Sequence, residues 1–109
     1  MKRIYLSGPM AGKPDLNREA FSRAESEFSA NGFDVVNPHA ISCEVMRNYA
    51  LRWNFLTDDE KYRLFLGHDL LNLCKCDEAH FLKGWQYSTG ANMEHSIAIG
   101  LKLDVTYES

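Results

Sequence analysis

Residues 84–98, GWQYSTGANMEHSIA, predict a glycine- and serine-rich turn that follows an apolar strand and opens a helix. On that helix Glu94 shares one face with Ala98 and Leu101, because residues three and four apart lie on the same side. This face is expected to pack inward. A carboxylate on a buried face is unfavourable unless it has partners or a chemical task. Glu94 is therefore the first candidate for a functional side chain.

A structural explanation of Glu94 has to be weighed beside the functional one. A capping box would need Ser or Thr three residues earlier, and Ala91 stands there. A favourable interaction with the helix dipole remains open, although Ser88 or Thr89 as the N-cap would place Glu94 beyond the first turn. A functional and a structural carboxylate both remain open from the pattern alone.

The composition predicts one soluble domain that spans residues 1–109, with 45% apolar and 25% charged residues. The net charge of −3 argues against binding a nucleic-acid polymer. No long apolar run or signal peptide is present, so we expect a cytoplasmic protein without membrane contact. The three cysteines and four histidines show no metal-ligand spacing, so we expect free thiols, no metal and no cofactor.

Strand and helix patterns alternate along the chain, which predicts an α/β domain with a largely parallel sheet covered by helices. We expect strands at 3–7, 33–36, 77–82 and 103–107, and helices from 15 or 17 to 30 (with Asp15 as N-cap), 43–54, 57–73 and 91–100. Thr57 and Glu60 form the capping box of the third helix. For Tyr49, Trp53 and Phe55 a lid, a partner-facing surface and a helix packed on the domain remain open.

The topology brings three segments to the carboxyl edge of the sheet, where such folds bind ligands. They are Ser7–Gly12, Asn37-Pro38 and Gly84–Gly90. The first contains two glycines between a strand and a helix. This arrangement suits an anion, but a tight turn explains the glycines equally well.

Asp69 repeats the pattern of Glu94, because it lies on the same helix face as Leu66 and Leu73. Two inward carboxylates on consecutive helices suggest a pair at one pocket, which acid–base or covalent chemistry on a glycosidic bond requires. The alternative is that both residues lie at the edges of their apolar faces and point to solvent.

The ordered segments IYLSGPMAG, LNREAF, FDVVNP, HDLLNLCKCDEAHFLKGW and STGANMEHSIAIGL resemble the nucleoside 2-deoxyribosyltransferase-like superfamily. Within it, the chain is most similar to the DUF4406 family of phages and bacteria. The resemblance covers nearly the whole chain except residues 39–60. It implies a flavodoxin-like (Rossmann-like) three-layer domain with a mainly parallel sheet of four to five strands, and a homodimer or larger homo-oligomer.

The resemblance also implies roles for individual residues. Glu94, in a Gly-x-x-x-Glu helix start, would be the nucleophile of a glycosyl-enzyme. Asp69 would protonate the leaving base or contact the sugar, and Tyr5 would orient Glu94. The expected substrate-binding residues are Ser7, Gly8, Pro9, Met10, Gly12, Ser88, Gly90 and Trp85. For Trp85, stacking on the base and burial as an aromatic residue at the end of a strand both remain open.

Ser88 favours a nucleotide, because related monophosphate hydrolases carry serine where nucleoside-using transferases carry aspartate. Such hydrolases often place an arginine near Ala11 or Gly12. Here the nearest cations are Lys13 and Arg18, and Lys13 is expected to substitute.

The expected function is cleavage of the N-glycosidic bond of a nucleoside 5′-monophosphate. Two alternatives stay open: base exchange by a nucleoside 2-deoxyribosyltransferase, and a non-catalytic module that binds or senses a nucleotide. In each case the expected partner is a small nucleoside or nucleotide.

Overall fold

β1 (Arg3–Ser7) is a central strand, and four of its five residues are buried because helices cover both of its faces. The computed structural model describes all residues, 1–109. Strand β1 pairs in parallel with β2 (Asp34–Val36) on one side and with β3 (Glu78–Phe81) on the other. β4 (Asp104–Tyr107) extends the sheet beyond β3, again in parallel, which gives the order β2-β1-β3-β4. The prediction of a mainly parallel sheet is confirmed.

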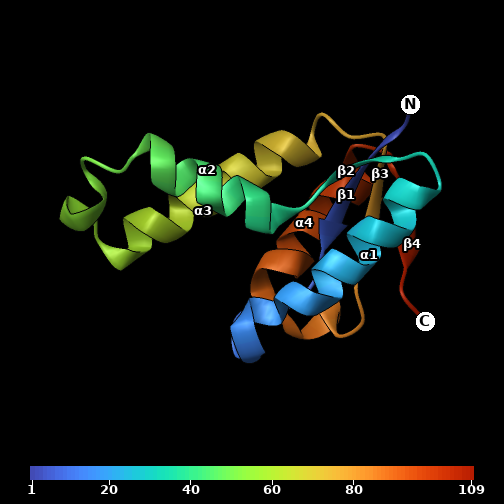
Figure 1. Cartoon of the computed structure of the whole chain (residues 1–109), viewed down its shortest axis with the longest axis horizontal. Helices are drawn as coiled ribbons and strands as arrows, with labels where there is room; N and C mark the ends of the chain where they lie inside the picture. Colours follow the sequence, from blue (N-terminus) through green and yellow to red (C-terminus); the bar gives the residue numbers. More distant parts are fainter.

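Four helices form the outer layers of the fold (Figure 1). They are α1 (Arg18–Ala30), α2 (Pro38–Asn48), α3 (Asp58–Leu73) and α4 (Thr89–Gly100), with short 3₁₀ turns η1 (Pro14–Asn17), η2 (Trp53–Phe55) and η3 (Trp85–Tyr87). Helix α1 leads from β1 outward to β2, whereas the later connections run in the opposite direction across the sheet. Right-handed crossovers therefore put α1 on one face and α3 and α4 on the other, as in a flavodoxin-like three-layer domain.

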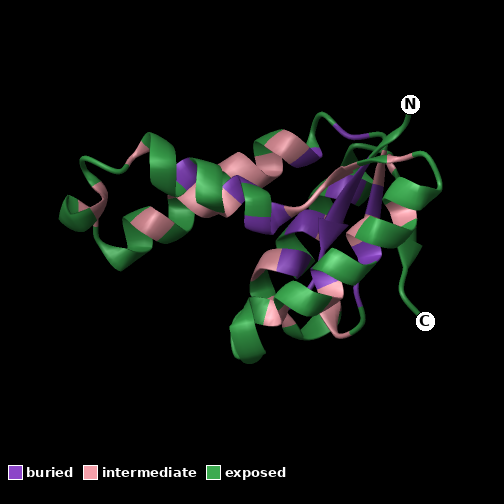
Figure 2. Ribbon diagram, in the orientation of Figure 1, coloured by how far each residue is buried: buried purple, intermediate pink, exposed green.

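The core has two parts, one on each face of the sheet. Leu6 and Phe21 belong to the part under α1, and Tyr5 and Phe81 belong to the part on the opposite face. Neighbouring residues of β1 thus enter different layers, because successive side chains of a strand point to opposite faces. Figure 2 shows that the buried residues gather on the sheet and on the inward sides of the helices around it.

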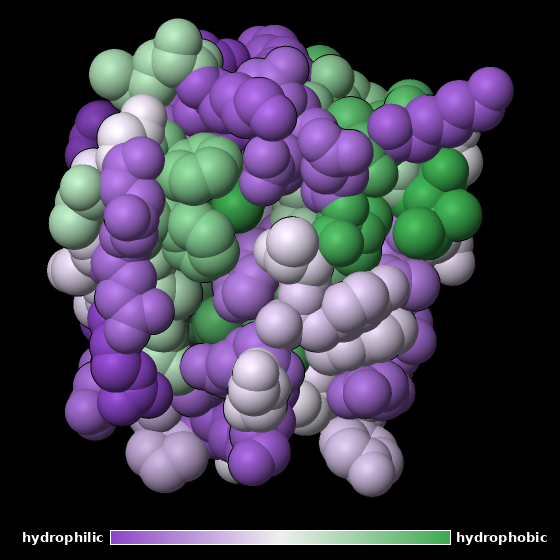
Figure 3. Space-filling model, turned by 90° about the vertical axis from the view of Figure 1, so that its right-hand side faces the viewer, coloured by the Kyte–Doolittle hydropathy of each residue, from purple (hydrophilic) through white to green (hydrophobic).

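Helix α2, turn η2 and helix α3 form an arm that projects from the sheet, at the left of Figure 1. The tip of the arm exposes apolar side chains, with Leu51 95% and Phe55 86% exposed, whereas Trp53 is half-buried against Phe65. On the face drawn in Figure 3, hydrophilic and hydrophobic residues are interleaved. None of the helices combines the length and the apolar character that a membrane span requires.

The ends of two helices follow the predicted signals. The Thr57 side chain accepts a bond from the Glu60 N–H, and the Glu60 side chain accepts one from the Thr57 N–H, so the capping box is confirmed. Helix α1 ends at Ala30, and Gly32, two residues later, has a φ of 89°, the left-handed conformation typical of a C-terminal cap.

The helix predicted at 43–54 is wrong in both bounds. Helix α2 begins directly after β2, because the Asn37 side chain accepts a hydrogen bond from the His39 N–H and Pro38 occupies the first helical position. It ends at Asn48, and residues 53–55 form a separate 3₁₀ turn. The consequence is that His39 lies at the carboxyl edge of the sheet.

Asp15 is not the N-cap of α1. Asp15, Leu16 and Asn17 all have left-handed backbones, with φ of 48°, 53° and 61°, so the right-handed helix begins only at Arg18. The Asn17 amide donates to the Pro9 carbonyl at 2.9 Å, which fixes this turn against the loop after β1.

Gly8 is required where the ends of β1 and β3 approach each other. A Cβ at Gly8 would lie 2.8 Å from the Cβ of Leu82, a contact that backbone movement must relieve. We expect Gly8→Ala to lower the free energy of unfolding by about 1–3 kcal/mol. The measurement is urea denaturation followed by circular dichroism.

Gly67→Ala in α3 is the matched control, because a Cβ there meets no atom within 4 Å. It is expected to raise the free energy of unfolding by up to about 1 kcal/mol through helix propensity. Equal effects of the two substitutions would contradict the close approach at Gly8.

Candidate active site

Glu94 is held by two hydroxyl groups of β1. Tyr5 and Ser7 lie two residues apart and so point to the same face of the strand, toward α4. The Tyr5 hydroxyl donates a short hydrogen bond to Oε2 of Glu94, and the Ser7 hydroxyl donates to Oε1 at 2.8 Å. All three residues are buried, and Glu94 is only 7% exposed. Each carboxylate oxygen thus has its own donor, and the group cannot rotate freely.

The start of α4 sets the position of Glu94. Ser88 is the N-cap, and its side chain accepts a hydrogen bond from the Ala91 N–H at 3.2 Å. Glu94 therefore lies in the second turn of the helix, beyond the range in which a carboxylate caps the free N–H groups. The hydrogen bonds to β1, and not capping, account for its inward position.

Opposing effects act on the ionisation of Glu94. The pKa of its carboxyl group is raised above the ordinary value, because burial outweighs the hydrogen bonds from Tyr5 and Ser7, which act in the other direction. Burial, followed by the charge of Glu94, raises the pKa of Tyr5 well above its ordinary value. Tyr5 consequently stays protonated and remains a donor to the carboxylate.

Asp69 of α3 lies in the same pocket as Glu94. Burial, followed by the charge of Glu94, raises the pKa of Asp69 to about 8. Its Oδ1 atom is buried and has no hydrogen-bond partner in the protein. Because this pKa lies above neutral, the carboxyl group of Asp69 is mainly protonated at pH 7.

The pocket is a cavity of about 520 Å³ at the carboxyl edge of the sheet. It lies where the chain leaves β1 and β3 in opposite directions, the usual ligand position in open parallel sheets. Among the residues expected from the sequence, those that line it are Gly8, Pro9, Met10, Asp69, Ser88, Gly90 and Glu94. Tyr5 and Ser7 lie behind Glu94 and act on the pocket through it.

Gly12 and Trp85 do not line the pocket. The Trp85 ring stacks on His95, with ring centroids 4.3 Å apart, and lies near Tyr107. Of the two alternatives for Trp85, packing against other aromatic residues at the end of β3 is the one observed.

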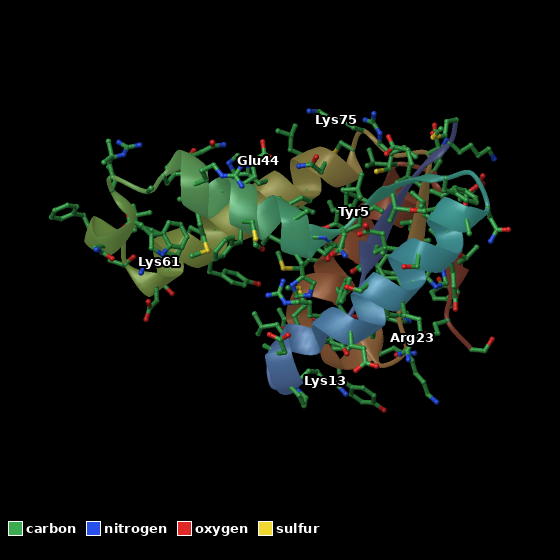
Figure 4. The ribbon with its side chains drawn as sticks, viewed as in Figure 1. Tyr5, Lys13, Arg23, Glu44, Lys61 and Lys75 are labelled. Carbon is green, nitrogen blue, oxygen red and sulfur yellow. The ribbon has the colours of Figure 1, made fainter.

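Arg18, and not Lys13, is the cation at the pocket. Lys13 lines a different cavity with Lys83 and Glu108 and lies at the lower end of the molecule, whereas Tyr5 lies near its centre (Figure 4). The left-handed turn before α1 explains this difference between prediction and structure, because it places Arg18, the first residue of the helix, against the cavity. Asp15 forms an ion pair with Arg18 at 3.4 Å.

Several residues that line the pocket were not named as site candidates from the sequence. Helix α2 contributes His39, Ser42, Cys43 and Met46, and α3 adds Tyr62, Phe65 and Leu66. The signal for His39 was present: it directly follows Asn37-Pro38, which was already placed at the carboxyl edge. No three or more His, Cys, Asp or Glu side chains converge as metal ligands would.

Comparison with known proteins gives one family match. Residues 2–107 match the family described as "Domain of unknown function (DUF4406)". A search of curated proteins finds no match. The family match spans nearly the whole chain, in agreement with the single fold described above, and the protein belongs to the DUF4406 family.

Proposed function

We propose that the protein cleaves the N-glycosidic bond of a nucleoside 5′-monophosphate, with Glu94 as the nucleophile. One observation carries the proposal: a buried carboxylate fixed by two donors faces the same cavity as a second carboxyl group that is protonated at neutral pH. Glycoside cleavage through a covalent intermediate uses two carboxyl groups, one ionised as the nucleophile and one protonated as the acid.

The first step forms a glycosyl-enzyme. Glu94 attacks the anomeric carbon of the sugar while the bond from that carbon to the base nitrogen breaks. The electron pair of the broken bond leaves with the base, and Asp69 supplies the proton that neutralises it. The hydrogen bonds from Tyr5 and Ser7 keep the Glu94 oxygens directed toward the sugar.

The second step regenerates the enzyme. Water attacks the anomeric carbon, the bond to Glu94 breaks, and Asp69, now a carboxylate, accepts the proton of the water. The products are the free base and the sugar 5-phosphate. Attack by a second base in place of water would give base exchange, so the acceptor alone separates the two reactions.

The start of α4 supports a phosphate at one end of the pocket. Because the Ser88 oxygen accepts from Ala91, its hydroxyl hydrogen is free to donate, and the Thr89 and Gly90 N–H groups lie in the unpaired first turn. Arg18 adds a positive charge to the same cavity. A dianion with these donors would receive charge-assisted hydrogen bonds.

The activity prediction concerns Glu94. We expect the wild type to release free base from at least one ribo- or deoxynucleoside 5′-monophosphate, and Glu94→Gln to reduce release at least about a thousandfold, because the nucleophile is lost. The measurement is chromatography of free base across a panel that includes modified pyrimidines. Glu44→Gln, on the exposed side of the arm (Figure 4), is the matched control and should retain full activity.

Other outcomes of the same assay have distinct meanings. Exchange of an added base without hydrolysis would identify a transferase with the same intermediate. Nucleotide binding that Glu94→Gln leaves unchanged, with neither release nor exchange, would reject the enzyme and favour a module that only binds nucleotides.

Asp69 should control the upper pH limit of the reaction. Since its pKa is about 8, kcat/KM is expected to fall above that pH by about tenfold per unit as the proton donor is lost. Asp69→Asn should lower kcat and abolish this decline. A steep decline at the same pH in Asp69→Asn would assign it to another group.

The raised pKa of Asp69 also predicts that the stability of the fold decreases as the pH rises. A carboxyl group whose pKa is lowered by folding would have the opposite effect. The folded state keeps the Asp69 proton up to about pH 8, whereas the unfolded chain loses it near pH 4, so stability falls as the pH rises between these values. Asp69→Asn should lose less stability than the wild type from pH 5 to pH 8. Thermal unfolding at both pH values measures this difference, and identical losses would contradict the assigned pKa.

A further inference from the structure

Two buried side-chain atoms in the protein have no hydrogen-bond partner, Nε2 of His39 and Oδ1 of Asp69. Both residues line the same cavity. Buried polar atoms are nearly always paired in folded proteins, so two exceptions in one pocket indicate bonds that a ligand completes. The proposed reaction uses Asp69 and leaves His39 without a task.

The His39 side chain is held in place by its surroundings. Asn37 caps the first turn of α2 through the His39 N–H, and the edge of the imidazole meets the ring of Phe21 with centroids 5.0 Å apart. The residue is only 6% exposed. His39 is therefore a fixed part of the cavity wall and not a mobile side chain.

His39 is uncharged at neutral pH. Burial, followed by the positive charge of Arg18, lowers the pKa of its imidazole, while a hydrogen bond with the backbone of Leu16 and then the charge of Asp15 act in the other direction. A neutral ring nitrogen offers one hydrogen bond without a charge. This chemistry suits the uncharged edge of a nucleobase better than it suits a phosphate.

The position of His39 in the cavity agrees with that chemistry. His39 follows β2 and Ser88 follows β3, and β1 with its loop lies between them, so the two residues approach the pocket from opposite sides. The arm that carries His39 also supplies an apolar wall to the cavity. This wall consists of Met46, Tyr62, Phe65 and Leu66. An apolar surface with one fixed polar atom is typical of a site for an aromatic ring.

We propose that His39 determines base specificity, by a hydrogen bond from Nε2 to the edge of the nucleobase held against the apolar wall of the arm. The inference rests on the proposed function, because it takes the ligand to be a nucleotide with its phosphate at the start of α4. It assigns the arm, residues 38–73, to recognition of the base.

The test separates the base from the rest of the ligand. In the Glu94→Gln background, which prevents turnover, calorimetry compares the best nucleoside 5′-monophosphate of the panel with ribose 5-phosphate, or 2-deoxyribose 5-phosphate where the nucleotide is a deoxynucleotide. His39→Leu retains apolar contact with Phe21 and removes the polar atom. It should bind the nucleotide about tenfold more weakly and the sugar phosphate with unchanged affinity.

Two amide variants provide matched controls. His39→Gln can place an amide group near the position of Nε2 and should restore most of the nucleotide affinity. His39→Asn carries the same group at the position of Nδ1 and should not. Should His39→Leu fail to fold, the comparison of Gln with Asn gives the same decision.

The result that overturns the inference is an equal loss for nucleotide and sugar phosphate, which would place His39 at the phosphate, or no loss for either. Absence of nucleotide binding in the Glu94→Gln protein would overturn it as well. Base release by the wild type tests the proposed function separately. Base-dependent binding without release rejects only the activity, and release that is insensitive to His39 rejects only this inference.

Discussion

Glu94 is almost completely buried, and an ionised carboxylate in that position loses most of its hydration. Two hydroxyl donors on one strand replace the lost water, and they can do so only if β1 is central and faces α4. The same requirement fixes the register of the strand: a shift by one residue would turn Tyr5 and Ser7 away and leave the charge without partners. The catalytic proposal and the central packing therefore depend on the same contacts.

The state of the second carboxyl group depends in part on the first. Burial, followed by the charge of Glu94, raises the pKa of Asp69, so the proposed reaction would have its proton donor beside the proposed nucleophile. Asp69 lies on α3, which reaches the pocket from the arm, whereas Glu94 lies on α4 above the sheet. The two carboxyl groups thus meet where the arm joins the α/β core.

The sequence predicted most of this arrangement where local signals were strong. The strand at 3–7, the capping box at Thr57 and the two inward carboxylates each follow from residues that lie close together in the chain. It did not predict the left-handed turn at 15–17, because that turn is held by a long-range bond from Asn17 to the Pro9 carbonyl. That turn also explains why Arg18, and not Lys13, lies at the pocket.

The first part of the arm, residues 39–56, was predicted least well. Helix α2 begins earlier than predicted because Asn37 caps it and Pro38 takes its first position, and residues 53–55 form a separate 3₁₀ turn. Polar atoms beside a ligand cavity do not need a hydrogen-bond partner within the protein. Nε2 of His39 is such an atom. Packing favours apolar side chains there, so a fixed polar atom is best explained by the ligand it meets.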